Sequence, residues 1–466
     1  MYRYIVPISI LIFCFIWACR PTWEISATTE ADKRIVPYKP YTQVTDGNPD
    51  AGFQYMIYGD LVGNGVPYDV HTRFFPARPD TILRRVGLNG GLPYHAIAFE
   101  RGEDVTVVSG NCFSCHAQKL NGQLILGLGN SFSDYTRSSM TIIRGFNWMV
   151  KLKYGKKSPE WAVYEEQAKW YEAIGHNLKM INQGLNPAFR LEEAAVAYRN
   201  PTDLAYQDSA NFEPLAFPVG TDVPPLWHAQ KKGMLYYNGV GRGDFTKLLM
   251  QASVLGVHDS TKARDIQQHF ADVLAWINTI EPPTYPGEID RKLAAEGELL
   301  FARHCEECHG SYGEKEFYPN KIIPLPIIQT DSAYAIYNLK TPLFDWYNQS
   351  WFAQTDPPSM NQASYGYMAP PLDGIWATAP YLHNGSVPDL WTLLDSKARP
   401  TYWQRTADSE DYNMQKVGWN YTDRNNPRGK WTYDTTLPGS SHVGHYFGDT
   451  LSTSERWAMI EYLKTL

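Results

Sequence analysis

Two five-residue stretches decide the fold of this chain: Cys112-Phe113-Ser114-Cys115-His116 and Cys305-Glu306-Glu307-Cys308-His309. In a Cys-x-x-Cys-His motif each thiol can add to a vinyl group of haem, and the adjoining His is held beneath the ring as an iron ligand. A lone Cys-x-x-Cys would equally suit a redox disulfide or half of a zinc site. Two copies, each followed by His, favour two covalent c-type haems (heme c). The predicted attachment residues are Cys112, Cys115, Cys305 and Cys308, and the predicted iron ligands are His116 and His309.

The two other cysteines of the six, Cys14 and Cys19, lie in an N-terminal targeting segment. Arg3 precedes an apolar run over residues 5–18, which is short for a membrane span but typical of a signal peptide. The run ends in Ile16-Trp17-Ala18-Cys19, which resembles a lipoprotein signal with a lipidated Cys19. Plain cleavage and an uncleaved anchor stay open as alternatives. We therefore expect an exported protein, periplasmic or attached to the outer membrane as a lipoprotein, with membrane contact through an N-terminal lipid anchor.

The bulk composition bounds the partners. The chain has 466 residues and a formal charge of −7 without a long Lys/Arg run, so no nucleic acid partner is expected. Aromatic residues make up 14% of the chain, including 31 Tyr and 15 Trp. That richness suits the lining of a flat cofactor, and it equally suits a secreted protein with many surface Tyr.

The pattern along the chain predicts a mainly α fold, with two cytochrome c-like haem domains and loop-rich, short β extensions. The expected divisions are a signal peptide over 1–19, a tether over 20–50, an N-terminal haem domain over 51–281 and a C-terminal haem domain over 288–466. A Pro-rich linker over residues 281–287 separates the two domains. No internal repeat is evident beyond the two haem motifs.

Local signals predict several elements. Residues 105–108 read as a strand, and helices are expected to begin at Ser158-Pro159 and at Asp259-Ser260. An apolar stripe over residues 289–301 leads straight into Cys305, and a capping box of Ser452 and Glu455 starts the last helix. In cytochromes c the first and last helices cross closely beside the haem. Gly297 would permit that approach by facing an aromatic such as Trp457.

Five longer stretches carry a family resemblance and follow one order along nearly the whole expected mature chain: residues 111–130, 224–232, 285–290, 371–386 and 444–448. They resemble the RoxA-like diheme cytochromes of the rubber oxygenase group. More distantly they resemble bacterial diheme cytochrome c peroxidases and MauG, which share the Thr-Ala-Pro-Tyr-x-His turn. The superfamily hosts several activities, so the resemblance does not name a substrate.

The resemblance implies unequal haems. His309 would serve an electron-transfer haem with His445 as its distal ligand, while Met368 and His383 stay open as alternative ligands. His116 would serve a reactive haem with an open or lightly blocked distal face. Trp227 matches an aromatic residue near the reactive haem and between the rings, and it is the candidate catalytic residue.

Each of these positions has a plainer interpretation. His445 would also suit a surface loop, and Trp227 would also suit an ordinary core. The turn at residues 378–380 resembles a peroxidase loop whose backbone carbonyls hold calcium, so the resemblance allows a calcium ion there.

The resulting functional hypothesis is a haem-dependent oxidoreductase of peroxidase or oxygenase type. Its expected partners are peroxide or dioxygen and an electron donor, either a small redox protein or a quinol-linked donor. One alternative is a non-enzymatic periplasmic electron-transfer cytochrome with both irons six-coordinate. Another is a MauG-like enzyme that oxidises a protein at a distance through Trp residues. Large flanking segments around each motif favour an enzyme, because a carrier needs little more than a wrap around its haem.

Overall fold

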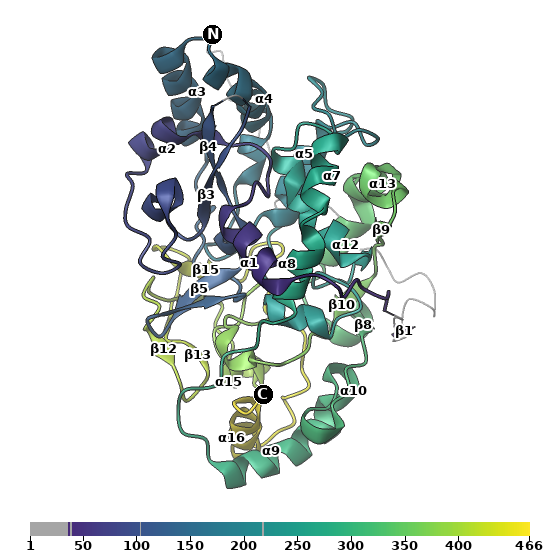
Figure 1. Ribbon diagram of the computed structural model, residues 1–466. Coiled ribbons are helices and arrows are strands. Elements are labelled where there is room, and N and C mark those ends of the chain that lie inside the picture. The colour runs from purple at the N-terminus through teal and green to yellow at the C-terminus, as the bar shows by residue number, and fades with distance from the viewer. Residues whose placement is uncertain (1–35, 38–39, 103, 217–218) are drawn as a thin grey trace, which may run out of the picture.

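The computed structural model describes residues 36–37, 40–102, 104–216 and 219–466 (Figure 1). The predicted signal peptide, with Cys14 and Cys19, lies outside these residues, as does most of the predicted tether. Within the described ranges, no helix combines the length and the apolar character that a bilayer span requires. The prediction of export therefore stays a prediction.

The described chain is rich in helices and carries only short strands, which confirms the mainly α prediction at this level. The helices are α1 (Pro49–Tyr58), α2 (Tyr68–Phe74), α3 (Met140–Tyr154), α4 (Pro159–Ile174), α5 (Ala188–Ala197), α6 (Phe245–Leu249), α7 (Ser260–Gln267), α8 (Phe270–Ile277), α9 (Arg291–His304), α10 (Glu306–His309), α11 (Leu325–Ile328), α12 (Ala333–Lys340), α13 (Leu343–Gln349), α14 (Trp351–Gln354), α15 (Leu390–Leu393) and α16 (Thr453–Leu463).

The strands form small antiparallel sheets in the orders β2-β4-β3, β1-β8-β10, β14-β11-β15, β5-β6, β7-β9 and β12-β13. Their bounds are β1 (Val36–Pro37), β2 (Val66–Pro67), β3 (Ala96–Glu100), β4 (Thr106–Gly110), β5 (Ala117–Leu120), β6 (Gln123–Leu126), β7 (Gly241–Gly243), β8 (Lys321–Pro324), β9 (Ser359–Asn361), β10 (Gly366–Met368), β11 (Tyr402–Gln404), β12 (Tyr412–Asn413), β13 (Gly418–Trp419), β14 (Thr422–Asp423) and β15 (Thr432–Asp434).

Most of the predicted helix starts are confirmed. The Ser158 side chain caps α4 by accepting from the Trp161 N–H, and Ser452 with Glu455 forms the capping box of α16. The helix expected from Asp259 is instead two helices, because the chain leaves α7 at Gln268 and starts α8 at Phe270.

Helices α9 and α16 cross closely, as predicted, but the contact residues differ from the expectation. A β-carbon at Gly297 would collide with the Ala458 carbonyl and lie 2.9 Å from Cβ of Tyr462. Trp457 instead lies against Trp391, with ring centroids 4.4 Å apart. Glycine is therefore needed at position 297 because another backbone, rather than an aromatic ring, occupies the space.

Two apolar cores dominate the described chain. One surrounds Phe113 and draws on helices from both sides of the 281–287 segment, including α8 and α12–α14. The other surrounds Phe301 and includes Trp227, Trp376 and Met459. Both cores therefore take side chains from both halves of the sequence, and the predicted division at the 281–287 segment stays a prediction.

An internal correspondence links residues 224–244 with residues 370–389, and it corrects the expectation of no repeat beyond the haem motifs. Each segment starts with Pro-Pro-Leu and later contains Asn-Gly. At one constant offset, an isolated bridge joins Leu235 to Gly241 in the first segment and Tyr381 to Val387 in the second. Each segment then ends at an Asp that caps a short helix, α6 or α15. The repeat escapes sequence inspection because it is a repeat of backbone conformation with few shared residues.

The two segments also contact each other reciprocally. The Met368 N–H donates to the Tyr237 carbonyl at 2.7 Å, and the Asp222 N–H donates to the His383 carbonyl at 2.9 Å. Tyr237 and His383 are counterparts in the correspondence, and so are Asp222 and Met368. The two halves therefore meet as approximate two-fold mates.

Candidate haem-binding sites

The C-terminal Cys-x-x-Cys-His motif follows directly from α9. The Cys305 N–H donates to the Phe301 carbonyl at 2.8 Å, and the motif then turns through the short helix α10. Nδ1 of His309 lies 2.8 Å from the Pro370 carbonyl and is assigned as its donor, which leaves Nε2 to bind a metal. Burial lowers the pKa of His309, so the imidazole is neutral, as a metal ligand must be.

His445 faces His309. Their ring centroids are 6.3 Å apart, with the ring planes inclined at 60°. An imidazole nitrogen lies about 2 Å from a metal and about 1 Å from its own ring centre, so two imidazoles on opposite sides of one iron place their centres about 6 Å apart. Burial and the nearby His309 lower the pKa of His445 to about 3. The pair therefore fits a haem closed by two neutral imidazoles.

A short loop with left-handed backbone holds His445. Gly444 has φ of +81° and His445 has φ of +50°. A β-carbon on Gly444 would collide with the backbone at Gln329 and Thr330. The buried Arg399 guanidinium donates to the carbonyls of Gly444 at 2.8 Å and of His445 at 3.2 Å. Gly444 thus lets the loop lie close to the end of α11, and the hydrogen bonds from Arg399 stabilise the loop.

A cavity of about 1380 Å³, including solvent at its mouth, surrounds this pair. Its wall is mostly apolar, with Phe301, Leu372, Leu394 and Met459 among the lining residues. An apolar wall around two opposed imidazoles suits the flat face of a porphyrin.

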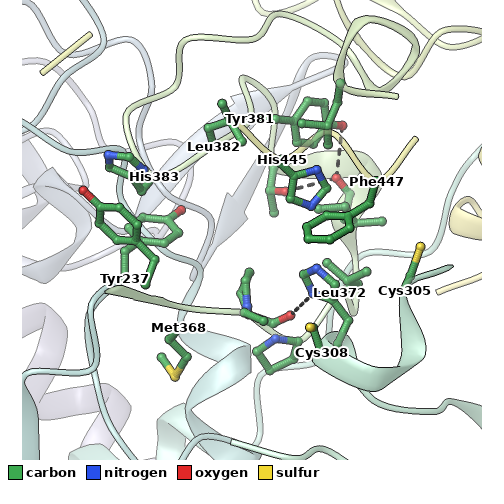
Figure 2. A pocket seen from close by; sticks show the side chains of 18 of the residues that line it. Tyr237, Cys305, Cys308, Met368, Leu372, Tyr381, Leu382, His383, His445 and Phe447 are labelled. Atoms are coloured by element: carbon green, nitrogen blue, oxygen red, sulfur yellow. Dashed lines mark hydrogen bonds between the residues drawn. The ribbon is translucent and has the colours of Figure 1, made fainter. Parts of the chain in front are cut away.

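The two alternative ligands, Met368 and His383, line the same cavity. Figure 2 places them beside Tyr237, apart from His445 and Phe447. The His383 ring stacks on Tyr367 at 4.1 Å, and its Nε2 is buried without a hydrogen-bond partner. His445 is the better-placed ligand, because its ring centroid lies 6.3 Å from that of His309.

Charged groups line one part of the cavity. Burial raises the pKa of Asp222 to about 7 and lowers the pKa of Lys232 to about 8. The Tyr237 hydroxyl donates to the Asp222 carboxylate at 3.2 Å. The Lys232 ammonium and the unpartnered His383 nitrogen form a polar region that fits the propionate groups of a haem, while the Tyr237 hydroxyl is already bonded to Asp222.

The N-terminal motif sits in the core around Phe113. The Asn111 side chain accepts from the Phe113 N–H at 3.0 Å and so starts the turn that carries both thiols. Nδ2 of Asn186 lies 3.0 Å from Sγ of Cys115. Burial lowers the pKa of His116 to about 4, an effect that the nearby Pro224 carbonyl opposes. Nδ1 of His116 makes no hydrogen bond of normal geometry. Pro224 and Pro370 are counterparts, so both imidazoles have a proline carbonyl behind them.

Glu192 of α5 is a residue that the sequence interpretation missed. Burial raises its pKa from 4.5 to about 8, so the carboxyl is protonated at neutral pH. Nε2 of Gln251 donates to its Oε2 at 3.2 Å, and Tyr236 lies close enough to Glu192 for a charge there to raise the Tyr236 pKa.

The correspondence between the halves makes Glu192 a candidate for the N-terminal site. Leu382 lines the C-terminal cavity, and its counterpart in the other half is Tyr236, the neighbour of Glu192. Asn186, which contacts the Cys115 thiol, lies just before α5. No motif marks a single Glu in a helical stretch, and only the correspondence between the halves identifies it.

Trp227 lies between the two motifs. Its indole N–H donates to the Asp373 carbonyl at 2.8 Å, three residues after the Pro370 that holds His309. β-Carbons added at Gly127 and Gly374 would lie 3.5 and 3.3 Å from the indole ring, so both glycines pack on it. The Gly127 N–H in turn donates to the His116 carbonyl at 2.8 Å. Trp227 therefore lies against Gly127, which is bonded to the His116 carbonyl, and against Asp373 and Gly374, which follow Pro370.

The turn at residues 378–380 gives no independent sign of calcium. The Ala379 carbonyl accepts the Trp419 indole N–H at 3.0 Å. Among the described residues, no group of three or more His, Cys, Asp or Glu side chains could hold a metal ion. A calcium ion bound by backbone carbonyls stays a prediction.

Comparisons with known proteins agree with this geometry at a coarse level. Residues 366–404 match the family described as RoxA-like, cytochrome c-like. Two Sinorhizobium fredii (strain NBRC 101917 / NGR234) proteins are similar to this chain: uncharacterized protein y4iJ at 33% identity over 40% of this chain and 41% of its own, and uncharacterized protein y4iM at 28% identity over 47% and 54%. The chain thus spans only about half the length of these relatives.

A solved structure described as a MauG-like protein associated with microbial copper homeostasis aligns with a TM-score of 0.28 at 16% identity, over 59% of this chain and 89% of that chain. The family match covers the segment that holds Met368, Pro370 and His383. It indicates a cytochrome c-like segment, for which haem c is the implied cofactor.

Proposed function

We propose that this chain is an exported diheme c-type cytochrome that acts as an oxidoreductase of peroxidase or oxygenase type. Two unequal sites support this proposal. His309 and His445 face each other with ring centroids 6.3 Å apart, which suits an iron held by both imidazoles. Near Tyr236, the counterpart of Leu382, lies the half-buried side chain of Glu192, and burial raises the pKa of its carboxyl to about 8. A haem with a free iron position would supply oxidant binding, whereas a haem held by two imidazoles would supply electron transfer.

The side chains divide the work of the C-terminal site. Cys305 and Cys308 would tether the cofactor, while His309 and His445 would hold its iron. The Pro370 carbonyl fixes the His309 tautomer, and Arg399 fixes the loop of His445. These supports make the geometry rigid, so ligand exchange is disfavoured there.

The N-terminal site is arranged for chemistry. Cys112 and Cys115 would tether the second cofactor and His116 would be its proximal ligand. A bound haem supplies the binding and reduction of peroxide or dioxygen. Glu192 is protonated at neutral pH and can donate a proton to an oxygen atom of the oxidant, and Gln251 orients its carboxyl group.

Trp227 would couple the two sites. Its ring packs against Gly127 beside His116 and against Gly374 beyond Pro370. An indole in this position would serve as a relay for electrons between the two sites when both hold haem. A MauG-like oxidation of another protein would use the same residue.

The remaining partners follow from the same proposal. The oxidant is peroxide or dioxygen, and the electrons come from a small redox protein or a quinol-linked donor. A signal segment ending at Cys19 would place the protein in the periplasm or on the outer membrane. The substrate class is left to experiment.

Low-temperature electron paramagnetic resonance of the oxidised, haem-loaded protein tests the proposal. We expect one low-spin haem that ignores added imidazole and one high-spin haem that imidazole converts to low spin. His445→Ala should add a second high-spin signal, whereas His383→Ala should not. Two low-spin haems that ignore imidazole, before and after partial reduction, would instead identify an electron-transfer cytochrome with both irons six-coordinate.

A further inference from the structure

Helix α3 exposes an unusual number of large apolar side chains. Ile142 is 43% exposed, Trp148 is 60% exposed and Leu152 is 64% exposed. The opposite side of the helix is buried, with Phe146 and Val150 packed in a separate apolar cluster with α4. At about 3.6 residues per turn the three exposed residues fall on one outer face. Phe74 of α2 packs against Gly145 beside this outer face of α3, and Ile142, Trp148 and Leu152 still stay exposed.

Basic side chains flank the outer face. Arg144 and Lys151 lie along one edge of it and Lys153 along the other, and Lys156 with Lys157 follows the end of the helix. Residues 137–157 contain no Asp or Glu, although the whole chain has a formal charge of −7.

Neighbouring elements neutralise little of this charge. Lys153 pairs with Asp69 of α2, and Nζ of Lys151 lies 4.9 Å from the centroid of the Trp161 ring. Arg144, Lys156 and Lys157 are exposed. The outer face is thus positive at its edges and apolar at its centre.

We propose that the outer face of α3 docks on an anionic phospholipid bilayer. An apolar centre flanked by Lys and Arg lets a helix lie in the headgroup region, with Trp and Leu inserted and the cationic ends reaching the phosphates. A protein partner fits less well, because protein interfaces are depleted of Lys, whereas this face carries several. The helix is already folded against α4, so docking requires little further ordering.

The arrangement of the molecule gives this docking a consequence. Figure 1 shows α3 and α4 at one end of the molecule and α9 with α16 at the opposite end. Docking through α3 would turn the C-terminal site away from the bilayer. A soluble electron donor could then reach that site while the protein stays on the membrane.

Vesicle co-sedimentation of the haem-loaded protein tests the proposal. In all samples a cleavable signal peptide of another exported protein replaces residues 1–19, so that neither an acyl chain nor the apolar run over residues 5–18 contributes to binding. We expect binding to phosphatidylcholine vesicles that contain about a quarter phosphatidylglycerol and little binding to phosphatidylcholine alone. Trp148→Glu with Leu152→Glu should weaken binding by at least about ten-fold.

A matched control is available on other elements. Leu299 is 63% exposed and Phe317 is 66% exposed, so Leu299→Glu with Phe317→Glu adds the same charge at equal exposure. This pair should bind as the parent does, and the Soret spectrum and thermal unfolding should match in all three proteins.

Equal binding by the α3 pair and the parent would overturn the proposal, and so would equal binding to neutral vesicles. If the parent ignores vesicles but the α3 pair slows reduction by a protein donor, the face is a protein contact and the proposal is also overturned.

Discussion

The segments over 224–244 and 370–389 share one backbone frame but present different side chains to their sites. Pro224 lies behind His116 as Pro370 lies behind His309, and each frame turns through a left-handed residue, Tyr236 or Leu382. The second frame is completed by the loop of His445, whereas the first has the protonated carboxyl of Glu192 near Tyr236. One backbone frame is thus completed by different neighbouring side chains in the two halves.

The two frames differ in the neighbouring segments that contact them. Arg399 fastens the His445 loop by donating to several of its carbonyls. Glu192 instead comes from α5, a helix that lies outside the repeated segments. The two frames therefore differ through the segments around them rather than through their own backbone.

The largest effect should follow from removing one pair of thiols. Cys112→Ala with Cys115→Ala should lower covalent haem from two to one per chain. It should also abolish turnover of the oxidant, peroxide or dioxygen, because the reactive site loses the thiols that attach its haem. Haem content by the pyridine haemochrome assay and activity on the same sample measure this. Cys305→Ala with Cys308→Ala is the reciprocal control. Unchanged turnover in the first variant would reverse the assignment of the two sites.

Glu192→Gln should have the next largest effect. Turnover should fall by about 10²- to 10⁴-fold, because Gln cannot donate the proton, while haem content and the Soret band stay unchanged. Glu165→Gln on the exposed face of α4 is the matched control and should leave turnover unchanged. A Glu192→Gln protein as active as the parent would remove Glu192 from the chemistry.

The pH dependence sharpens the same point. Burial raises the pKa of Glu192 from 4.5 to about 8, so the acid form predominates at neutral pH and is lost above about 8. Activity should therefore fall as the pH rises through about 8, and the Glu192→Gln protein should lack that limb. The free energy of unfolding of the parent should fall, relative to the variant, as the pH rises from about 4.5 to about 8 and should level off above that, because over this range the folded protein keeps a proton that the unfolded chain has lost. A parallel pH profile for both proteins would contradict the assignment.

Arg399→Gln should selectively loosen the C-terminal site. Without the guanidinium, the carbonyls of Gly444 and His445 lose their donor and the loop becomes mobile. We expect part of the low-spin signal to become high-spin or exchangeable with imidazole, while the N-terminal haem is unaffected. Arg405→Gln, which removes another buried guanidinium, is the control. If the spectrum does not change, other contacts hold His445.

Gly297→Ala should have the smallest effect on the sites and act mainly on stability. The new β-carbon collides with the Ala458 carbonyl, so α9 and α16 must separate slightly. The free energy of unfolding should fall by about 1–3 kcal/mol. Leu299→Ala, at an exposed position of the same helix, is the control, and thermal unfolding of both variants measures the difference. Equal stability of the Gly297→Ala protein and the parent would show that the two helices can move apart freely.

From the sequence alone, two haem-attachment motifs and several local structures are predictable. Two Cys-x-x-Cys-His motifs, the capping box at Ser452 and the Ser158 cap are local patterns, and local patterns are readable because their partners lie a few residues away. His445 was predicted as an iron ligand from the family resemblance, because a single His in a loop has no local sequence signature.

How the two halves are arranged relative to each other depends on tertiary contacts and is not readable from the sequence. The reciprocal bonds of Asp222 with His383 and of Met368 with Tyr237, the position of Glu192 and the outer face of α3 all depend on segments far apart in the chain. The physical reason is that burial, which raises the pKa of Glu192, and exposure, which leaves Trp148 at the surface, are properties of the packed molecule and not of any short stretch of its sequence.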